Sequence, residues 1–181
     1  QLSIAADDPF HSAQFLMFAA FGACLRQKAD FAALVLPHLD GSDNPDILVR
    51  GYLFLGQTAG ADDVLALAVT GHPSAEGRFG ALEGLRHAGL AGRIPPDEIA
   101  HLGLAALAQE TEARNRTLLV EMIATAGGEE GLAALESIVM GAAPGVARGE
   151  TGLVGPAASM IAVKMDPERA QATLEKALAS A

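Results

Sequence analysis

The side chains that could perform chemistry are few and scattered along the chain. Some metal-dependent hydroxylases built from helices form a di-iron site from recurring His-Glu pairs, which supply imidazole and carboxylate ligands. None of the five histidines is followed by Glu; they are His11, His38, His72, His87 and His101. The single cysteine, Cys24, excludes an intrachain disulfide. We therefore predict no catalytic residues, no metal site and no cofactor.

One Gly-rich segment could close over a ligand. It runs from Gly141 to Gly152 and is the longest stretch without helical periodicity. No Gly-Lys-Ser or Gly-Lys-Thr follows it, so it is not a phosphate-binding loop. We interpret it as a flexible connector.

The acidic residues gather where helices are expected to begin. The formal net charge is −10, and many carboxylates fall in predicted first turns, where the positive end of the helix dipole stabilises them. These residues are Asp62, Asp63, Asp97, Glu98, Glu129, Glu130 and Glu168. An acidic chain with no Trp and one Tyr lacks the basic, aromatic surface that nucleic acids require. We expect no nucleic-acid partner.

Hydrophobic periodicity predicts an all-α chain. The expected helices are 8–27, 30–39, 46–58, 62–70, 75–88, 96–109, 112–126, 129–140, 153–165 and 167–179. Pro96 and Pro167 fall in first turns, and Asp166 is placed to cap the last helix. No window alternates as a strand does, and no apolar run reaches the roughly 18 to 20 residues of a membrane span. We predict helices throughout and no membrane association.

A sequence motif recurs along these helices. A turn is followed by Arg near a helix start, an apolar stretch and then Gly, with the arginines at Arg50, Arg78 and Arg116. A fourth copy, around 149–165, has Gly155 in place of the Arg. Equivalent positions lie about 28 to 39 residues apart. Internal repetition on this scale predicts a helical solenoid, which builds binding surfaces.

The repeated residues resemble the HEAT repeat family. The family motif has a Leu-rich first helix, an Asp-Pro turn, then Val-Arg and Leu-Gly. This chain has similar residues in the same order: the Leu-rich stretch 34–39, the turn Asp43-Asn-Pro45-Asp46, Val49-Arg50 and Leu55-Gly56. The resemblance implies one domain over 1–181, a right-handed α-α superhelix of about five antiparallel helix pairs. It also implies that turn acids and arginines form a structural ladder, in which Arg50 pairs with Asp46 or Asp43 and Arg116 pairs with Glu110 or Glu112.

In stacked helix pairs the second helices commonly line the concave side. The residues expected to bind a ligand there are exposed polar positions of the second helices: Arg78, Glu83, Arg86, Arg114 and Glu121. Such a mixed-charge groove suits a protein or peptide, so the prediction is a non-enzymatic scaffold. The alternative that the resemblance leaves open is an enzyme accessory or bilin-lyase-like protein that holds a small ligand, such as a tetrapyrrole, in the same groove.

The N-terminal segment has its own features. The chain begins with Gln, which predicts a fragment of a longer chain or a processed form. Five of the seven Phe lie between Phe10 and Phe31, most of them in the helix expected at 8–27. That helix is interpreted as the second of a pair whose first helix is missing, and its open face would then self-associate.

Overall fold

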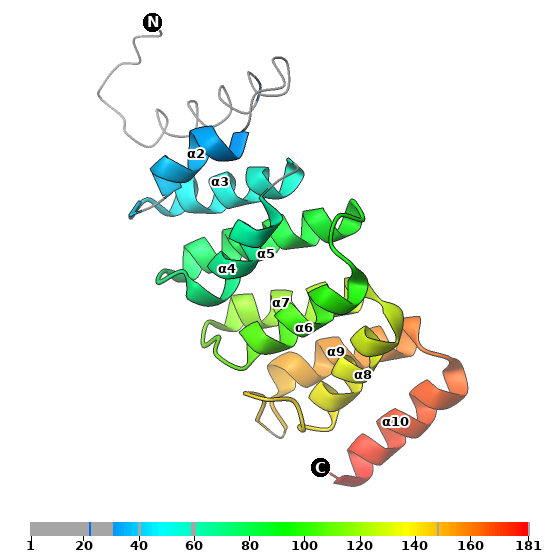
Figure 1. Ribbon diagram of the computed structural model, residues 1–181. Helices are drawn as coiled ribbons and strands as arrows, with labels where there is room; N and C mark the ends of the chain where they lie inside the picture. The colour runs from blue at the N-terminus through cyan, green and yellow to red at the C-terminus, as the bar shows by residue number, and fades with distance from the viewer. Residues whose placement is uncertain (1–21, 23–30, 40, 59–60, 148, 181) are drawn as a thin grey trace, which may run out of the picture. The chain divides into compact units, whose positions relative to one another are not determined.

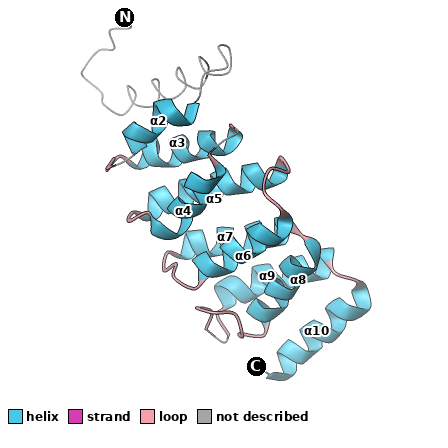
Figure 2. Ribbon diagram, viewed as in Figure 1, coloured by secondary structure: helices cyan, strands magenta, loops and turns pink. Residues whose placement is uncertain are grey.

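A computed structural model of the chain describes residues 22, 31–39, 41–58, 61–147 and 149–180. Within these ranges the fold is all-α, without a strand (Figure 2). The helices are α2 (Phe31–Leu39), α3 (Pro45–Gln57), α4 (Asp62–Gly71), α5 (Ala75–Leu90), α6 (Pro96–Leu107), α7 (Ala113–Ala126), α8 (Gly128–Val139), α9 (Thr151–Lys164) and α10 (Pro167–Ser180). They gather in two compact units, Gln1–His87 and Ala88–Ala181, so that the boundary falls within α5.

The predicted all-α class is confirmed. Predicted and observed boundaries differ by two residues or fewer, and the largest differences are the end of α5 at Leu90, the end of α6 at Leu107 and the start of α9 at Thr151. The Phe-rich helix predicted over 8–27 lies outside the described residues except for Gly22, which is helical. No helix in the described ranges is both long enough and apolar enough to cross a bilayer.

Side-chain caps explain why two of the helices begin where they do. The Asn44 Oδ1 accepts hydrogen bonds from the backbone N–H groups of Asp46 (3.0 Å) and Ile47 (3.4 Å), and Pro45 occupies the first turn of α3. The predicted cap of α10 is confirmed, because the Asp166 Oδ1 accepts from the backbone of Glu168 at 3.0 Å.

Glycine in the left-handed region ends two other helices. Gly92 has φ +71°, and the next N–H, of Arg93, bonds to the Ala88 carbonyl at 3.0 Å after the end of α5. Gly141 has φ +63°, and the Ala142 N–H bonds to the Ser137 carbonyl at 2.8 Å after α8. In both turns a glycine permits the reversal that satisfies the last helical carbonyls.

In the first unit, α3 packs against both α2 and α4. The chain of α3 also passes very close to α5, and a Cβ at Gly56 would overlap the Gly84 backbone. A Cβ at Gly80 would lie 2.8 Å from the Leu48 carbonyl oxygen. Small residues on both helices are therefore a condition of this packing. The largest fully buried side chains of this unit are Leu39, Leu48, Leu55, Leu65, Leu82 and Leu85.

In the second unit, α6 pairs with α7 and α8 pairs with α9 (Figure 1). These two pairs stack, with α7 on α9 and α6 on α8, so first helices meet first helices and second helices meet second helices. The last helix, α10, packs against α8 and α9. The largest fully buried side chains here are Leu107, Leu119, Met122, Ile123, Leu135 and Ile138.

Candidate functional site

The first unit contains an open cleft of about 600 Å³. Two turns and the first half of α3 enclose it: the turn between α2 and α3, and the turn between α4 and α5. The lining residues are Leu39, Gly41, Ser42, Asp43, Pro45, Leu48, Tyr52, His72, Pro73, Ser74 and Glu76. Its volume falls in the range of sites that bind small molecules or short peptide segments.

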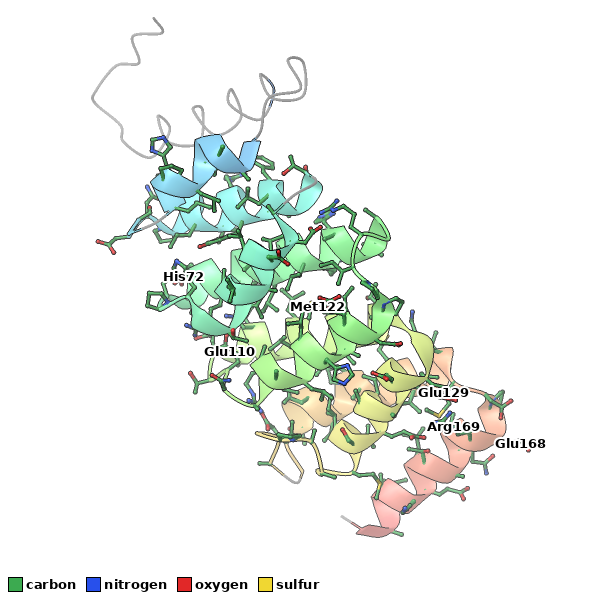
Figure 3. All side chains as sticks on the ribbon, in the orientation of Figure 1. His72, Glu110, Met122, Glu129, Glu168 and Arg169 are labelled. Carbon is green, nitrogen blue, oxygen red and sulfur yellow. The ribbon has the colours of Figure 1, made fainter. Side chains whose placement is uncertain are left out.

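His72 is the central polar residue of this cleft, at the end of α4 (Figure 3). Its Nδ1 accepts the backbone N–H of Ser74 at 3.1 Å, so the neutral imidazole carries its proton on Nε2. The ring stands edge-on to Tyr52, with centroids 5.6 Å apart and planes at 83°. A Cβ at Gly77 would overlap the imidazole, so the first turn of α5 accommodates the ring only because Gly77 has no side chain.

Ser74 completes the turn. Its Oγ accepts the backbone N–H of Gly77 at 3.0 Å, which caps the start of α5, and lies 3.2 Å from the His72 Nδ1. A hydroxyl beside an imidazole is also the beginning of a nucleophilic pair. Here both groups bond to the backbone of their own turn, and the arrangement holds one wall of the cleft rigid.

The cleft has an apolar floor and an acidic rim. Leu39 and Leu48 are each 1% exposed and line it from below, next to the buried ring of Tyr52. Asp43 is exposed and Glu76 is half-buried. Neither carboxylate makes a hydrogen bond or ion pair with any residue that the structure describes. The two carboxylates thus bring negative charge to the cleft.

Three of the predicted binding residues lie on α5, in the first unit. Glu83 and Arg86 form an ion pair, with Arg86 Nη2 2.6 Å from Glu83 Oε2. Arg78 donates its Nη1 to the main-chain carbonyls of His72 (2.9 Å) and Pro73 (3.0 Å). The guanidinium of Arg78 therefore holds the turn between α4 and α5.

The other two predicted binding residues, Arg114 and Glu121, lie on α7 in the second unit. Both are exposed, and their spacing of seven residues places them on one face, two turns apart. The opposite face of α7 is buried through Leu119, Val120 and Ile123.

The predicted ladder residues have specific positions. Asp46 and Arg50 both lie on α3 and are half-buried. Glu110 is 6% exposed, and its carboxylate accepts from the backbone N–H groups of Thr111 and Glu112, each at 2.9 Å, and from the amide of Asn115 at 3.0 Å. The Glu110 side chain thereby organises the turn that leads into α7.

Arg116 joins that turn to a later part of the chain. Its Nη1 donates to the main-chain carbonyl of Glu110 at 2.7 Å and to that of Leu107 at 3.2 Å. Its Nη2 lies 2.9 Å from the Glu150 carboxylate, at the start of α9. This hydrogen-bonded guanidinium lowers the pKa of Glu150 below its ordinary value.

Arg78 and Arg116 repeat one geometry. Each lies in the first turn of a second helix, and each donates Nη1 to the main-chain carbonyl six residues earlier. These carbonyls, of His72 and Glu110, follow the ends of the first helices, where a cation is favoured by the helix dipole. The repeat in the sequence thus corresponds to a repeated contact at two positions.

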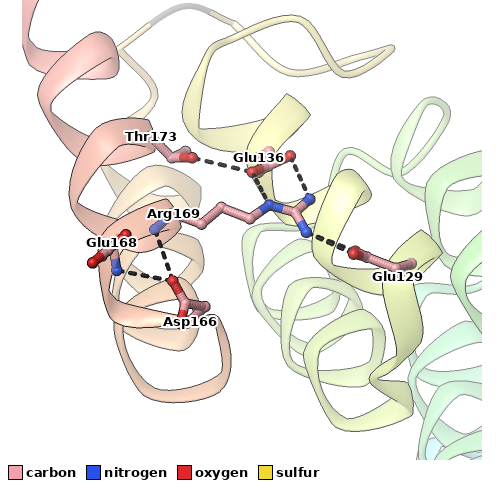
Figure 4. A network of polar contacts seen from close by, with 6 residues as sticks. All are labelled: Glu129, Glu136, Asp166, Glu168, Arg169 and Thr173. Atoms are coloured by element: carbon pink, nitrogen blue, oxygen red, sulfur yellow. Dashed lines mark hydrogen bonds and ion pairs between the residues drawn. The ribbon is translucent and has the colours of Figure 1, made fainter.

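A polar network that sequence reasoning did not find joins α10 to α8 (Figure 4). Arg169 Nε lies 3.1 Å from Glu136 Oε1, and its Nη1 lies 2.7 Å from Glu129 Oε2. The Thr173 hydroxyl donates to Glu136 as well, at 3.1 Å. The hydrogen bond from Arg169 is the main cause that lowers the pKa of Glu136, and the two carboxylates raise that of Arg169.

Neither metal ligands among the described residues nor similar known proteins indicate a function for these sites. Among the described residues, no group of three or more His, Cys, Asp or Glu side chains could hold a metal ion. Comparison of the chain with protein-family models, with curated proteins and with solved structures gave no match.

Proposed function

We propose that this protein is a non-enzymatic scaffold that binds a protein or peptide segment along its second helices. In this proposal the helix pairs continue as a HEAT-like right-handed superhelix of about five pairs, with the second helices on the concave side. The stacking of α7 on α9 and of α6 on α8 supports it, because successive pairs in such a superhelix meet in this way.

The observation that carries the proposal is the solvent-exposed face of α7. Its exposed polar positions hold an arginine, a glutamate and a threonine, Arg114, Glu121 and Thr125, while residues 118–120 and 122–124 of the same helix are buried. The Glu121 carboxylate makes no hydrogen bond or ion pair with the described residues. A face of both charges on a rigid helix suits the mixed groups of a peptide better than a uniformly charged polymer.

The five predicted residues differ in the contacts that they make, and we assign them different roles in the proposal. Arg114 and Glu121 are presented on α7 and are the proposed contact residues. Glu83 and Arg86 form a pair that a partner would meet already assembled. Arg78 holds its own turn, and its loss would disturb the fold rather than binding alone.

The test is affinity capture from the source cell's lysate with the full chain. The variant Arg114→Ala/Glu121→Ala is compared with Glu98→Ala/Lys164→Ala, which also removes one cation and one anion from exposed positions, on α6 and α9. We expect a partner that the control retains and the α7 variant loses, at unchanged circular dichroism. Equal capture by both variants would refute the proposed role of α7.

A ligand screen addresses the competing class of function. A panel of tetrapyrroles and metal ions is added to the full chain while its melting temperature is followed. On the scaffold proposal none of them raises the melting temperature. Saturable stabilisation by a tetrapyrrole would instead identify a small-ligand protein.

A further inference from the structure

We infer that the cleft between the two turns of the first unit binds a basic side chain, Arg or Lys, of a peptide segment. This site is lined by α2, α3, the turns beside them and the first turn of α5, and none of these belongs to the α7 face of the proposed function. Binding at this cleft and binding at the α7 face are therefore independent, and each is tested by its own variants.

The shape of the lining matches an amphipathic side chain. Arginine and lysine place their aliphatic stems on apolar surface and keep the charged group near water. The buried Leu39 and Leu48, with Tyr52, offer the apolar surface, and Asp43 and Glu76, which are more exposed, offer carboxylates to the charged group.

Charge selects the sign of the occupant. Asp43 comes from the turn before α3 and Glu76 from the first turn of α5, so two separate segments bring carboxylates to one cleft. Neither forms an ion pair with a residue that the structure describes. A guanidinium or ammonium would pair with them, whereas a carboxylate or phosphate would be repelled.

The walls of the cleft are rigid enough to hold this arrangement. The Ser74 cap, the Ser74–His72 hydrogen bond and the two bonds from Arg78 to the His72 and Pro73 carbonyls fix one turn. The Asn44 cap fixes the other. Binding would therefore order few additional groups, which preserves affinity.

The volume favours a peptide over a free amine. A cleft of about 600 Å³ exceeds what one basic side chain fills, so neighbouring peptide groups would occupy the remainder. Ser42 and Ser74 lie in the lining as polar neighbours for a peptide backbone.

The experiment is an NMR titration of the full, ¹⁵N-labelled chain. The probe is acetyl-Gly-Ala-Arg-Ala-Gly-amide, and the matched peptide has citrulline, which keeps the shape of arginine without its charge. Arginine amide alone tests the free amine. We expect a Kd of about 0.1 to 1 mM for the arginine peptide, with amide shifts in 41–45 and 72–76, and weaker binding of the other two.

Two charge variants complete the test. Asp43→Asn/Glu76→Gln should weaken binding of the arginine peptide by roughly three- to tenfold, as expected for the loss of two partly exposed ion pairs. Asp63→Asn/Glu98→Gln makes the same change of net charge at exposed helix starts and should leave Kd unchanged. Equal binding of the citrulline peptide, or equal weakening by both variants, would overturn the inference, as would shifts confined to other residues.

Discussion

Arg116 of α7 binds the carboxylate of Glu150, which lies 34 residues later at the start of α9, through Nε–Oε1 and Nη2–Oε2 contacts of 3.1 and 2.9 Å. The same guanidinium donates to main-chain carbonyls of Leu107, Glu110 and Gly145. One side chain, 11% exposed, thus connects the end of α6, the start of α7 and the loop before α9.

Removing this guanidinium should destabilise the second unit. We expect Arg116→Met to lower the free energy of unfolding by about 2 to 3 kcal/mol, since several charge-assisted bonds to partly buried groups are lost. Arg78→Met, which removes two carbonyl bonds, should lower it by about 1 kcal/mol. Urea denaturation measures both, with the exposed Lys164→Met as control. An effect of Arg116→Met no larger than that control would contradict the connecting role.

The lowered pKa values predict sensitivity to acid. Glu136 and Glu150 each bind fewer protons in the folded than in the unfolded state near their ordinary pKa, so they stabilise the fold above about pH 4.5. This stabilisation is lost as the pH falls through the folded values. Urea midpoints measured between about pH 6 and 3 should therefore decrease, and Glu136→Gln/Glu150→Gln should flatten the curve. A variant as acid-labile as the parent would disprove the assignment.

Two glycine substitutions should have opposite effects, because only the first glycine lies where α3 passes close to α5. Gly56→Ala should destabilise the chain by about 1 to 3 kcal/mol, because the new methyl group would overlap the Gly84 backbone. Gly152→Ala has open space in the first turn of α9 and should be neutral or stabilising by up to about 1 kcal/mol. Thermal and urea unfolding of both variants decide the point, and a neutral Gly56→Ala would mean that the helices separate readily.

The Arg169 network predicts how firmly α10 is held. Hydrogen exchange of the α10 amides should accelerate severalfold in Arg169→Met, since the bonds to Glu129 and Glu136 both disappear. Glu136→Gln should have a larger effect than Glu129→Gln, because the Glu136 side chain is 27% exposed and that of Glu129 is 75% exposed. The exchange of α6 provides an internal reference. The reverse order of the two variants would show that Glu136 contributes little.

Much of the fold could be predicted from local signals. Helix starts at Pro96 and Pro167 and the cap by Asp166 depend on neighbouring residues, and the structure has these helices as expected. The arginine of the recurring motif also had a recognisable position. The partners of Arg116 were harder to predict. Glu150 is distant in the sequence, and every residue has a main-chain carbonyl, so the residue types do not mark which one accepts the hydrogen bond.

The cleft could not be predicted for a related reason. Asp43 and His72 each belong to a segment whose sequence predicts only a turn that connects two helices. Only the packing of α3 against its neighbours brings the two turns to one cavity. The available signal was the His-Pro turn followed by Ser74 and Gly77, which indicates a cap but gives no sign of a facing carboxylate.

The two hydrogen bonds from Arg78 to the His72 and Pro73 carbonyls lie within one helix pair, since both carbonyls belong to the turn that Arg78 follows. When the segment that encodes such a helix pair is duplicated, the arginine and both of its acceptor carbonyls are duplicated together. Tandem duplication of the segment would need no compensating change elsewhere to hold each new turn in place. The number of pairs in proteins built this way can therefore change by whole units during evolution, while the side chains on the outer faces diverge.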